Sequence, residues 1–221
     1  MTAAELRDTD PAFLRKNFGV VMARIQNELR GVSCLSLESS QPRKQIISSR
    51  SFGQPVIHIE ELSEAICHYT ALACQKLRKQ GSLTGRIYVF IQTGVHDPRR
   101  RYENGITLSF PTPLSSSSQI MAYARQGIRK IFNPGYQYKK AGVILLDLSS
   151  ARSRQEDMLS PALQDRHDIL SETADRINQK FGNDTVTFCA EGIHRPWKNR
   201  NDMKSPAYTT QWENLAPAYC K

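Results

Sequence analysis

Residues 86–110 read RIYVFIQTGVHDPRRRYENGITLSF, and this segment decides the predicted fold. In residues 86–93 every second side chain is apolar, and residues 106–110 alternate in the same way. A period of two residues places one face of a strand in a core and leaves the other face exposed. The sequence therefore predicts two strands joined by a basic loop. The loop contains Arg99, Arg100 and Arg101.

Further strands are predicted at residues 45–52 and 139–148, and helices at residues 59–80 and 119–132. The predicted order is β-α-β-β-α-β, an α+β fold. Split β-α-β units give a four-stranded antiparallel sheet with both helices on one face. On the other face we expect polar and basic side chains, although the adjacent Ile46 and Ile47 leave the faces of the first strand ambiguous. The expected residues are Ser48, Arg50, Arg86, Thr107 and Ser109.

The flanking segments are predicted to be helical in part. Asp10 and Pro11 are typical of a helix start, and apolar residues then recur every three or four positions as far as Gly31. The predicted apolar stripe is Leu14, Phe18, Val21, Ile25 and Leu29. One such helix cannot bury its own stripe, so it must pack on another element. Towards the C-terminus we expect a helix over residues 168–181 and a short strand over 185–190.

The surplus of positive charge lies in the middle segment of the chain. Residues 41–150 contain 15 Lys and Arg against 6 Asp and Glu, a surplus equal to the net charge of +9. Residues 1–40 and 151–221 each have no net charge. A solvated basic surface is the simplest explanation for any one cluster, but confinement of the whole surplus to one segment favours a polyanionic partner.

Several classes of protein are not indicated. No apolar run approaches the ~20 residues of a membrane helix, and no signal peptide is recognisable, so we expect a cytoplasmic protein that does not bind membranes. Five cysteines without CxxC spacing predict reduced thiols, with Cys67 and Cys74 buried on one helix face. We find no metal-ligand spacing, phosphate loop or nucleophile motif. Asp147 has no partner carboxylate nearby in the sequence, so we interpret it as structural.

Four segments resemble one family. They lie at residues 24–37, 44–53, 136–143 and 205–212. In this order they are similar to the end of the thumb, the start and the last strand of the little finger, and a small C-terminal module of Y-family translesion DNA polymerases, in the polymerase V catalytic-subunit (UmuC-like) branch. The resemblance implies an end of the thumb with its connector over residues 1–40, a little finger over 41–150, a linker over 151–165 and the module over 166–221.

The resemblance also implies a function. In this family the little finger holds template–primer DNA by its phosphates, without reading the bases. Lys, Arg, Ser and Thr side chains suit that task. The candidate DNA-binding residues are Ser48, Arg50, Arg86, Arg99, Arg100, Arg101, Thr107, Ser109, Lys139 and Lys140. The family's palm and fingers, with their metal-binding carboxylates, have no counterpart here. We therefore expect this chain alone to be neither an enzyme nor a holder of a cofactor, whereas the full-length family uses Mg²⁺.

The resemblance implies further partners, namely UmuD′-like subunits and RecA. In addition, residues 155–159 (QEDML) are similar to the sliding-clamp peptide of bacterial polymerases, with Gln155, Met158 and Leu159 as anchors. This copy departs from the pattern, because Glu156 replaces a usual apolar residue and Leu159 a usual aromatic one. We expect any clamp binding to be weak.

Two alternatives stay open. The chain could be a stand-alone single-strand nucleic-acid binder with a sheet like that of RNA-recognition modules, in which Tyr88 and Phe90 would stack on bases. Those modules carry their aromatic residues on strands one and three, whereas these two lie on the second predicted strand. The chain could also be an interaction fragment that binds the clamp or recombination-filament proteins.

Overall fold

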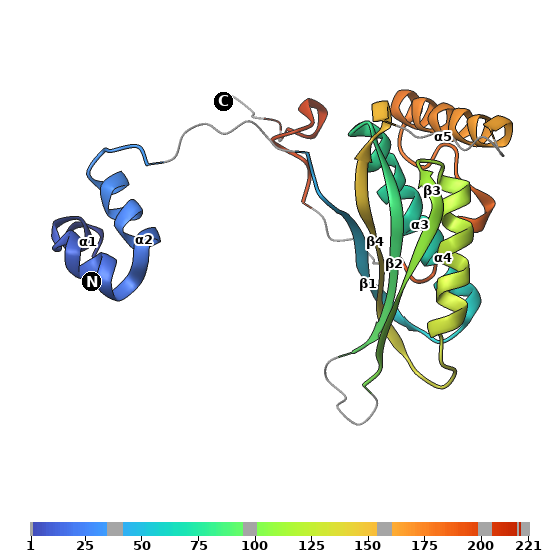
Figure 1. Cartoon of the computed structure of the whole chain (residues 1–221), viewed down its shortest axis with the longest axis horizontal. Helices are drawn as coiled ribbons and strands as arrows, with labels where there is room; N and C mark the ends of the chain where they lie inside the picture. The colour runs from blue at the N-terminus through green and yellow to red at the C-terminus, as the bar shows by residue number, and fades with distance from the viewer. Residues whose placement is uncertain are drawn as a thin grey trace. The chain divides into compact units, whose positions relative to one another are not determined.

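The computed structural model describes residues 2–34, 42–94, 101–153, 161–198, 205–215 and 217. The side chains of 153, 161–165 and 214 are not part of this description. The chain folds into two compact units, residues 1–42 and residues 43–221. The larger unit contains the sheet and most of the helices (Figure 1).

The sheet has four antiparallel strands in the order β1-β4-β2-β3, as the sequence predicts for the class of fold. Its strands are β1 (Ile46–Val56), β2 (Ser82–Thr93), β3 (Glu103–Leu114) and β4 (Tyr138–Ser150). β4 and β2 are central, and β1 and β3 form the edges. β3 continues through Pro111 and Pro113, past residues 106–110, whose alternation predicts the strand. An edge strand tolerates proline because one row of its N–H groups needs no partner.

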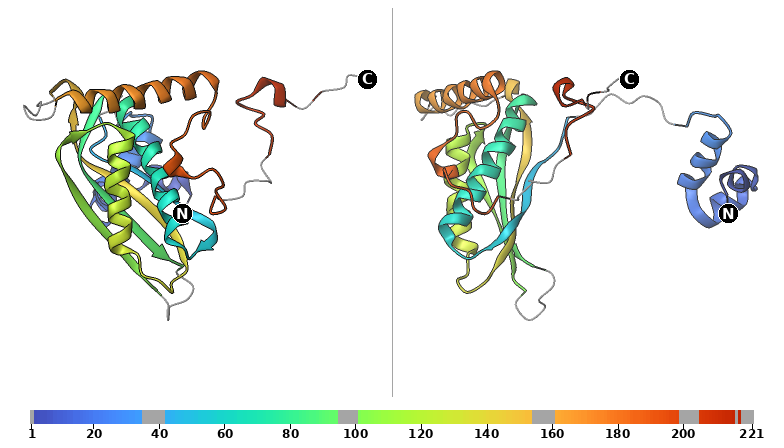
Figure 2. Two further views of the ribbon diagram at one scale, coloured as in Figure 1. Left: turned by 90° about the vertical axis from the view of Figure 1, so that its right-hand side faces the viewer. Right: turned by 180° about the vertical axis from the view of Figure 1, so that it is seen from behind.

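Both predicted helices pack on one face of the sheet (Figures 1 and 2). They are α3 (Ile59–Lys79), which contacts β1, β4 and β2, and α4 (Ser117–Ile131), which contacts β3 and β2. The apolar side of β2 enters the core between sheet and helices, where Ile87, Val89 and Ile91 are fully buried. This burial confirms the alternation in the sequence. It leaves the opposite side of β2 to solvent.

A third helix, α5 (Pro161–Phe181), lies across one end of the helix layer (Figure 2) and begins earlier than predicted. The strand predicted over residues 185–190 is wrong: a short 3₁₀ turn, η3 (Cys189–Glu191), takes its place. Two more 3₁₀ turns are described: η2 (Ala151–Ser153) directly follows β4, and η4 (Trp212–Asn214) follows η3 along the chain.

The segment after α5 completes the core behind α3. Trp197 is 3% exposed, and its ring lies 5.7 Å from the rings of both His68 and Tyr69 and 6.3 Å from that of Phe52. The carbonyl of Trp197 also accepts a backbone hydrogen bond from Gly53 of β1. β1 and the segment after α5 thus meet beside α3.

Polar contacts join the same segments. His68 Nδ1 lies 2.9 Å from Glu191 Oε2, and the guanidinium of Arg195 approaches the same carboxylate at 3.5 Å. Arg78 donates two hydrogen bonds to the carboxylate of Asp175 on α5, at 2.7 and 3.0 Å. Arg78 lies in the last turn of α3, where a positive charge complements the helix dipole. Its partner Asp175 is 97 positions away, so no local pattern predicts the pair.

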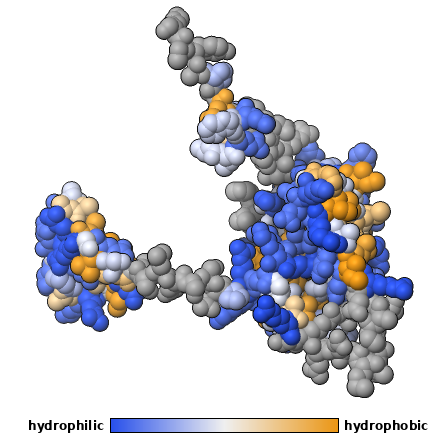
Figure 3. All heavy atoms as spheres, turned by 90° about the horizontal axis from the view of Figure 1, so that it is seen from above, coloured by the Kyte–Doolittle hydropathy of each residue, from blue (hydrophilic) through white to orange (hydrophobic). Residues whose placement is uncertain are grey.

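The smaller unit contains α1 (Ala3–Asp8) and α2 (Pro11–Leu29). The sequence predicts α2 as one continuous helix, but Gly19 has φ of 81° and kinks it. Of the predicted stripe only Leu14 is buried, and the other four members are at least 40% exposed. Apolar residues accordingly appear on this unit's surface among hydrophilic ones (Figure 3).

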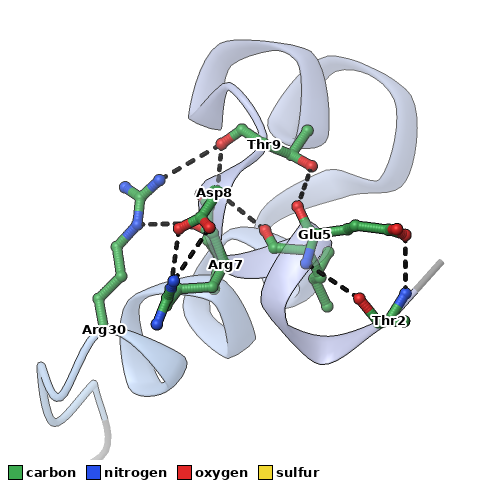
Figure 4. A network of polar contacts seen from close by, with 8 residues as sticks. Thr2, Glu5, Arg7, Asp8, Thr9 and Arg30 are labelled. Carbon is green, nitrogen blue, oxygen red and sulfur yellow. Dashed lines mark hydrogen bonds and ion pairs between the residues drawn. The ribbon is translucent and has the colours of Figure 1, made fainter.

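Polar side chains cap α1 and connect it to α2 (Figure 4). Thr2 and Glu5 form a capping box at the start of α1. At its other end Arg30 donates hydrogen bonds to the carbonyls of Arg7 and Thr9. The buried amide of Gln26 donates to the same carbonyls and to that of Leu6. The last carbonyls of a helix have no partner within that helix. Here Gln26 of α2 and Arg30, the residue that follows α2, provide the donors.

Candidate nucleic-acid interface

The sheet face opposite α3 and α4 is the candidate interface, and we call it the exposed face. Register and side-chain alternation assign its members. They are Ile47, Ser49 and Ser51 of β1; Arg86, Tyr88, Phe90 and Gln92 of β2; Glu103, Gly105, Thr107 and Ser109 of β3; and Lys140, Gly142, Ile144 and Leu146 of β4. The face is therefore mixed: Ile47, Ile144 and Leu146 lie beside its aromatic centre, and apart from the two glycines the remaining members are polar or charged.

Ser48 and Arg50 lie on the other face, so their predicted placement is wrong. Ser48 pairs with Val143 and Arg50 with Ala141, and both partners point into the core. Burial raises the pKa of Tyr69 on α3 to about 12, and the positive charge of Arg50 opposes that shift, which places Arg50 near the helix layer. The adjacent isoleucines 46 and 47 allowed either assignment of faces, and only the pairing with β4 decides it.

Ser49 and Ser51 take the places expected of Ser48 and Arg50. They pair with Gly142 and Lys140 on the exposed face. Thr107 and Ser109 lie where the sequence predicts, opposite Tyr88 and Arg86, and both are exposed. Hydroxyl groups from both edge strands thus flank the central pair of strands.

Arg86 is on the exposed face but has an acidic neighbour. Its Nε lies 2.7 Å from Asp147 Oδ2, and both side chains are more than half exposed. Asp147 has φ of 51° and lies opposite Gly85, where an added Cβ would come within 3.2 Å of the Asp147 Cβ. The acidic residue interpreted as structural therefore reduces the positive charge that Arg86 presents.

Other cations gather at the end of the sheet nearest the β2–β3 loop. The pairing of β2 with β4 shifts here by one residue, because Gln92 pairs with Lys140 and Thr93 with Tyr138. Lys139 is the extra residue of β4 at this bulge. Lys140 lies on the exposed face, with its Nζ 6.0 Å from the centre of the Phe90 ring. Arg101 is exposed and lies 3.6 Å from Glu103. Arg101, like Arg86, thus has an acidic partner.

Five further predicted site residues lie outside the described residues. They are Arg99, Arg100, Gln155, Met158 and Leu159. Their roles stay predictions.

Neither a metal centre nor a membrane span is found in the part of the chain that the structure describes. No group of three or more His, Cys, Asp or Glu residues there could hold a metal ion. No described helix is long and apolar enough to cross a bilayer.

Comparison with known proteins identifies the family. Residues 43–158, which contain the whole sheet and both covering helices, match the model of the impB/mucB/samB family C-terminal domain. The chain belongs to the impB/mucB/samB family. Residues 168–218 match a domain of unknown function, DUF4113.

Members of the impB/mucB/samB family resemble the chain along nearly its whole length. It is 34% identical to ImpB of Salmonella typhimurium over 220 residues and 35% identical to UmuC of Salmonella typhimurium LT2 over 219, each alignment covering 97% of the chain and 51% of the relative. MucB of Escherichia coli is 34% identical over 222 residues, with coverage of 100% and 52%. The chain thus spans about half the length of these relatives.

Solved structures show more distant similarity. An insertion ternary complex of Dbh DNA polymerase aligns with a TM-score of 0.42 and 12% identity, covering 68% of this chain and 42% of that one. A Y-family DNA polymerase chimera of Dbh and Dpo4 aligns with a TM-score of 0.39 and 16% identity, covering 66% and 41%.

Proposed function

We propose that this chain is the DNA-holding C-terminal part of an error-prone translesion DNA polymerase of the SOS response. Its larger unit binds template–primer DNA through phosphate contacts that do not depend on base sequence. One observation carries the proposal: the segment that matches the family model also contains the whole charge surplus and folds into a sheet with one face exposed. Lys140, Arg86 and the surrounding hydroxyls provide donors suited to phosphate oxygens.

In this proposal, other parts of a complete polymerase carry out the catalysis. Phosphoryl transfer by two metal ions requires several converging carboxylates. Two of the described acidic residues are instead paired with cations, Asp147 with Arg86 and Asp175 with Arg78. The Mg²⁺ of the reaction would be held by other parts of a complete polymerase.

The stand-alone RNA-recognition alternative loses support. β1 and β3, the strands that carry aromatic residues in such modules, are the two separated edges of this sheet. The relatives also extend to about twice the length of this chain, which favours a part of a larger protein over an independent module.

A titration with DNA tests the proposal. We expect the chain to bind duplex template–primer of unrelated sequences with similar affinity, and log K to fall linearly with log salt. Changing Arg99, Arg100 and Arg101 together to Ala should weaken binding to every sequence and reduce the salt slope by about 0.9 for each phosphate that is no longer neutralised. An unchanged slope would contradict a role for the loop, and no binding by the unaltered chain would contradict the proposal itself.

Binding to a sliding clamp, UmuD′-like subunits and RecA stays part of the proposal as well. The clamp would be bound through Gln155, Met158 and Leu159. Replacing these three residues with Ala should abolish a weak interaction measured with purified clamp and leave DNA binding unchanged.

A further inference from the structure

An aromatic pair occupies the centre of the exposed face. Tyr88 and Phe90 point away from the core on β2, with ring centres 5.9 Å apart and an angle of 22° between the ring planes. Each is only partly buried. The core on the other side of the sheet is filled by different residues of the same strand, so these two rings are not needed there.

Two glycines provide the space that the rings occupy. A Cβ at Gly105 of β3 would clash with the hydroxyl oxygen of Tyr88, and one at Gly142 of β4 would come within 2.8 Å of the Phe90 ring. Each ring thus extends sideways over the bare backbone of a neighbouring strand. Because the two ring planes are nearly parallel and each ring covers a glycine, together they form an aromatic surface close to the sheet. We call this surface the aromatic platform.

The charge around the aromatic platform suits a nucleotide. The Nζ of Lys140 lies 6.0 Å from the Phe90 ring centre, so a base stacked on the ring would have its phosphate within reach of an ammonium group. Thr107 and Ser49 flank the platform on β3 and β1 and can donate hydrogen bonds. A paired base inside a duplex has both faces covered by its neighbours, so only an unpaired base can stack here.

We propose that Tyr88 and Phe90 bind an unpaired nucleobase of single-stranded DNA, with Lys140 holding the adjacent phosphate. The inference rests on the proposed function, because it adds a single-strand subsite to a surface that binds duplex by its backbone. The inference predicts that the chain binds template–primer DNA with an unpaired template segment more tightly than blunt duplex with the same paired length.

The test uses the full chain and two DNA probes, a blunt duplex and the same duplex with a single-stranded template extension. Replacing Tyr88 and Phe90 together with Leu keeps apolar cover over the glycines but removes the rings. We expect binding to the extended probe to weaken roughly 5- to 150-fold, the range that stacking of one base represents. Binding to blunt duplex should weaken much less, so that the ratio of the two affinities falls towards one, and Tyr88→Trp with Phe90→Trp should restore the preference.

A 2-aminopurine in the extension reports stacking directly. Its fluorescence should be quenched by the unaltered chain and not by the Leu variant. Equal weakening on both probes would show that the rings only support the sheet, and would overturn the inference while leaving the proposed function intact. An unaltered chain that binds neither probe would overturn both.

Discussion

A basic residue on the exposed face of the sheet is not necessarily free to bind a phosphate, and Arg86 is an example. Its guanidinium lies 2.7 Å from the carboxylate of Asp147, and a phosphate must compete with that carboxylate. Lys140 instead has an aromatic ring as its neighbour. The sequence separates these two cases poorly, because Asp147 is 61 positions away from Arg86 and the strand register alone brings them together.

Removing the acidic partner should therefore strengthen DNA binding. Asp147→Asn keeps the side-chain shape, and Asn tolerates the positive φ of this position. We expect a severalfold higher affinity for duplex DNA at low salt, with the gain shrinking as salt screens the charges. Glu60→Gln, which makes the same charge change on α3, is the matched control. Equal gains in the two variants would show that only net charge matters.

The buried thiols of Cys67 and Cys74 should differ in reactivity from the exposed thiol of Cys189. Burial raises the pKa of both Cys67 and Cys74 from 9.0 to about 12, whereas Cys189 is exposed. The thiolate is the reactive form, so at pH 8 iodoacetamide should modify Cys189 well before either buried thiol. Peptide mapping by mass spectrometry measures the three rates. Comparable rates at Cys67 and Cys189 would contradict the burial.

The same shifts predict alkaline destabilisation. A raised pKa means that the folded state keeps protons that the unfolded state loses between pH 9 and pH 12. The stabilisation is therefore complete below pH 9 and is lost as pH rises towards 12. Urea unfolding at pH 8 and pH 10.5 should show a lower free energy of unfolding at the higher pH. Cys67→Ala with Cys74→Ala should reduce that difference.

Among the elements, β1 and the segment after α5 show most clearly what the sequence could not settle. Alternation located β2 and its buried side, because Ile87, Val89 and Ile91 are separated by polar or aromatic residues. In β1 the adjacent isoleucines gave no such signal, and pairing with β4 was needed. The contact between His68 and Glu191 joins residues 123 positions apart, so no local pattern could reveal it.

The two tryptophans of the chain provide a matched test of the segment after α5. Trp197 is 3% exposed against α3, whereas Trp212 is 88% exposed. Trp197→Ala should lower the free energy of unfolding of the larger unit by about 3–5 kcal/mol. Trp212→Ala should change it by no more than about 0.5 kcal/mol.

Denaturant unfolding followed by circular dichroism measures both effects. Trp197→Phe should retain much of the stability, because the buried indole N–H has no hydrogen-bond partner within the described residues. If Trp197→Ala were no more destabilising than Trp212→Ala, residues 182–198 would not be part of the core.

At the scale of the whole molecule, the two faces of the sheet in the larger unit have different roles. The helix layer and the segment that matches DUF4113 pack together behind the sheet, through Trp197 and the pair of Arg78 with Asp175. The exposed face is the one that we propose binds DNA. The class of fold and this division follow from the sequence, because alternation and helical periodicity are local. Tyr88 and Phe90 could be named as a stacking pair from the sequence, but the space for their rings depends on Gly105 and Gly142 of two other strands, which only the structure shows.

The most direct test of the central claim compares two double variants that remove the same charge from opposite faces. Lys139→Ala with Lys140→Ala alters the end of β4 beside the exposed face, and Arg125→Ala with Arg129→Ala alters exposed positions on α4. Template–primer DNA is titrated with each variant over a series of salt concentrations. We expect the lysine variant to bind more weakly, with a salt slope smaller by about 0.9 for each phosphate left without its lysine, and the arginine variant to match the unaltered chain. Equal weakening in both variants, or weakening only in the arginine variant, would contradict binding through the exposed face of the sheet.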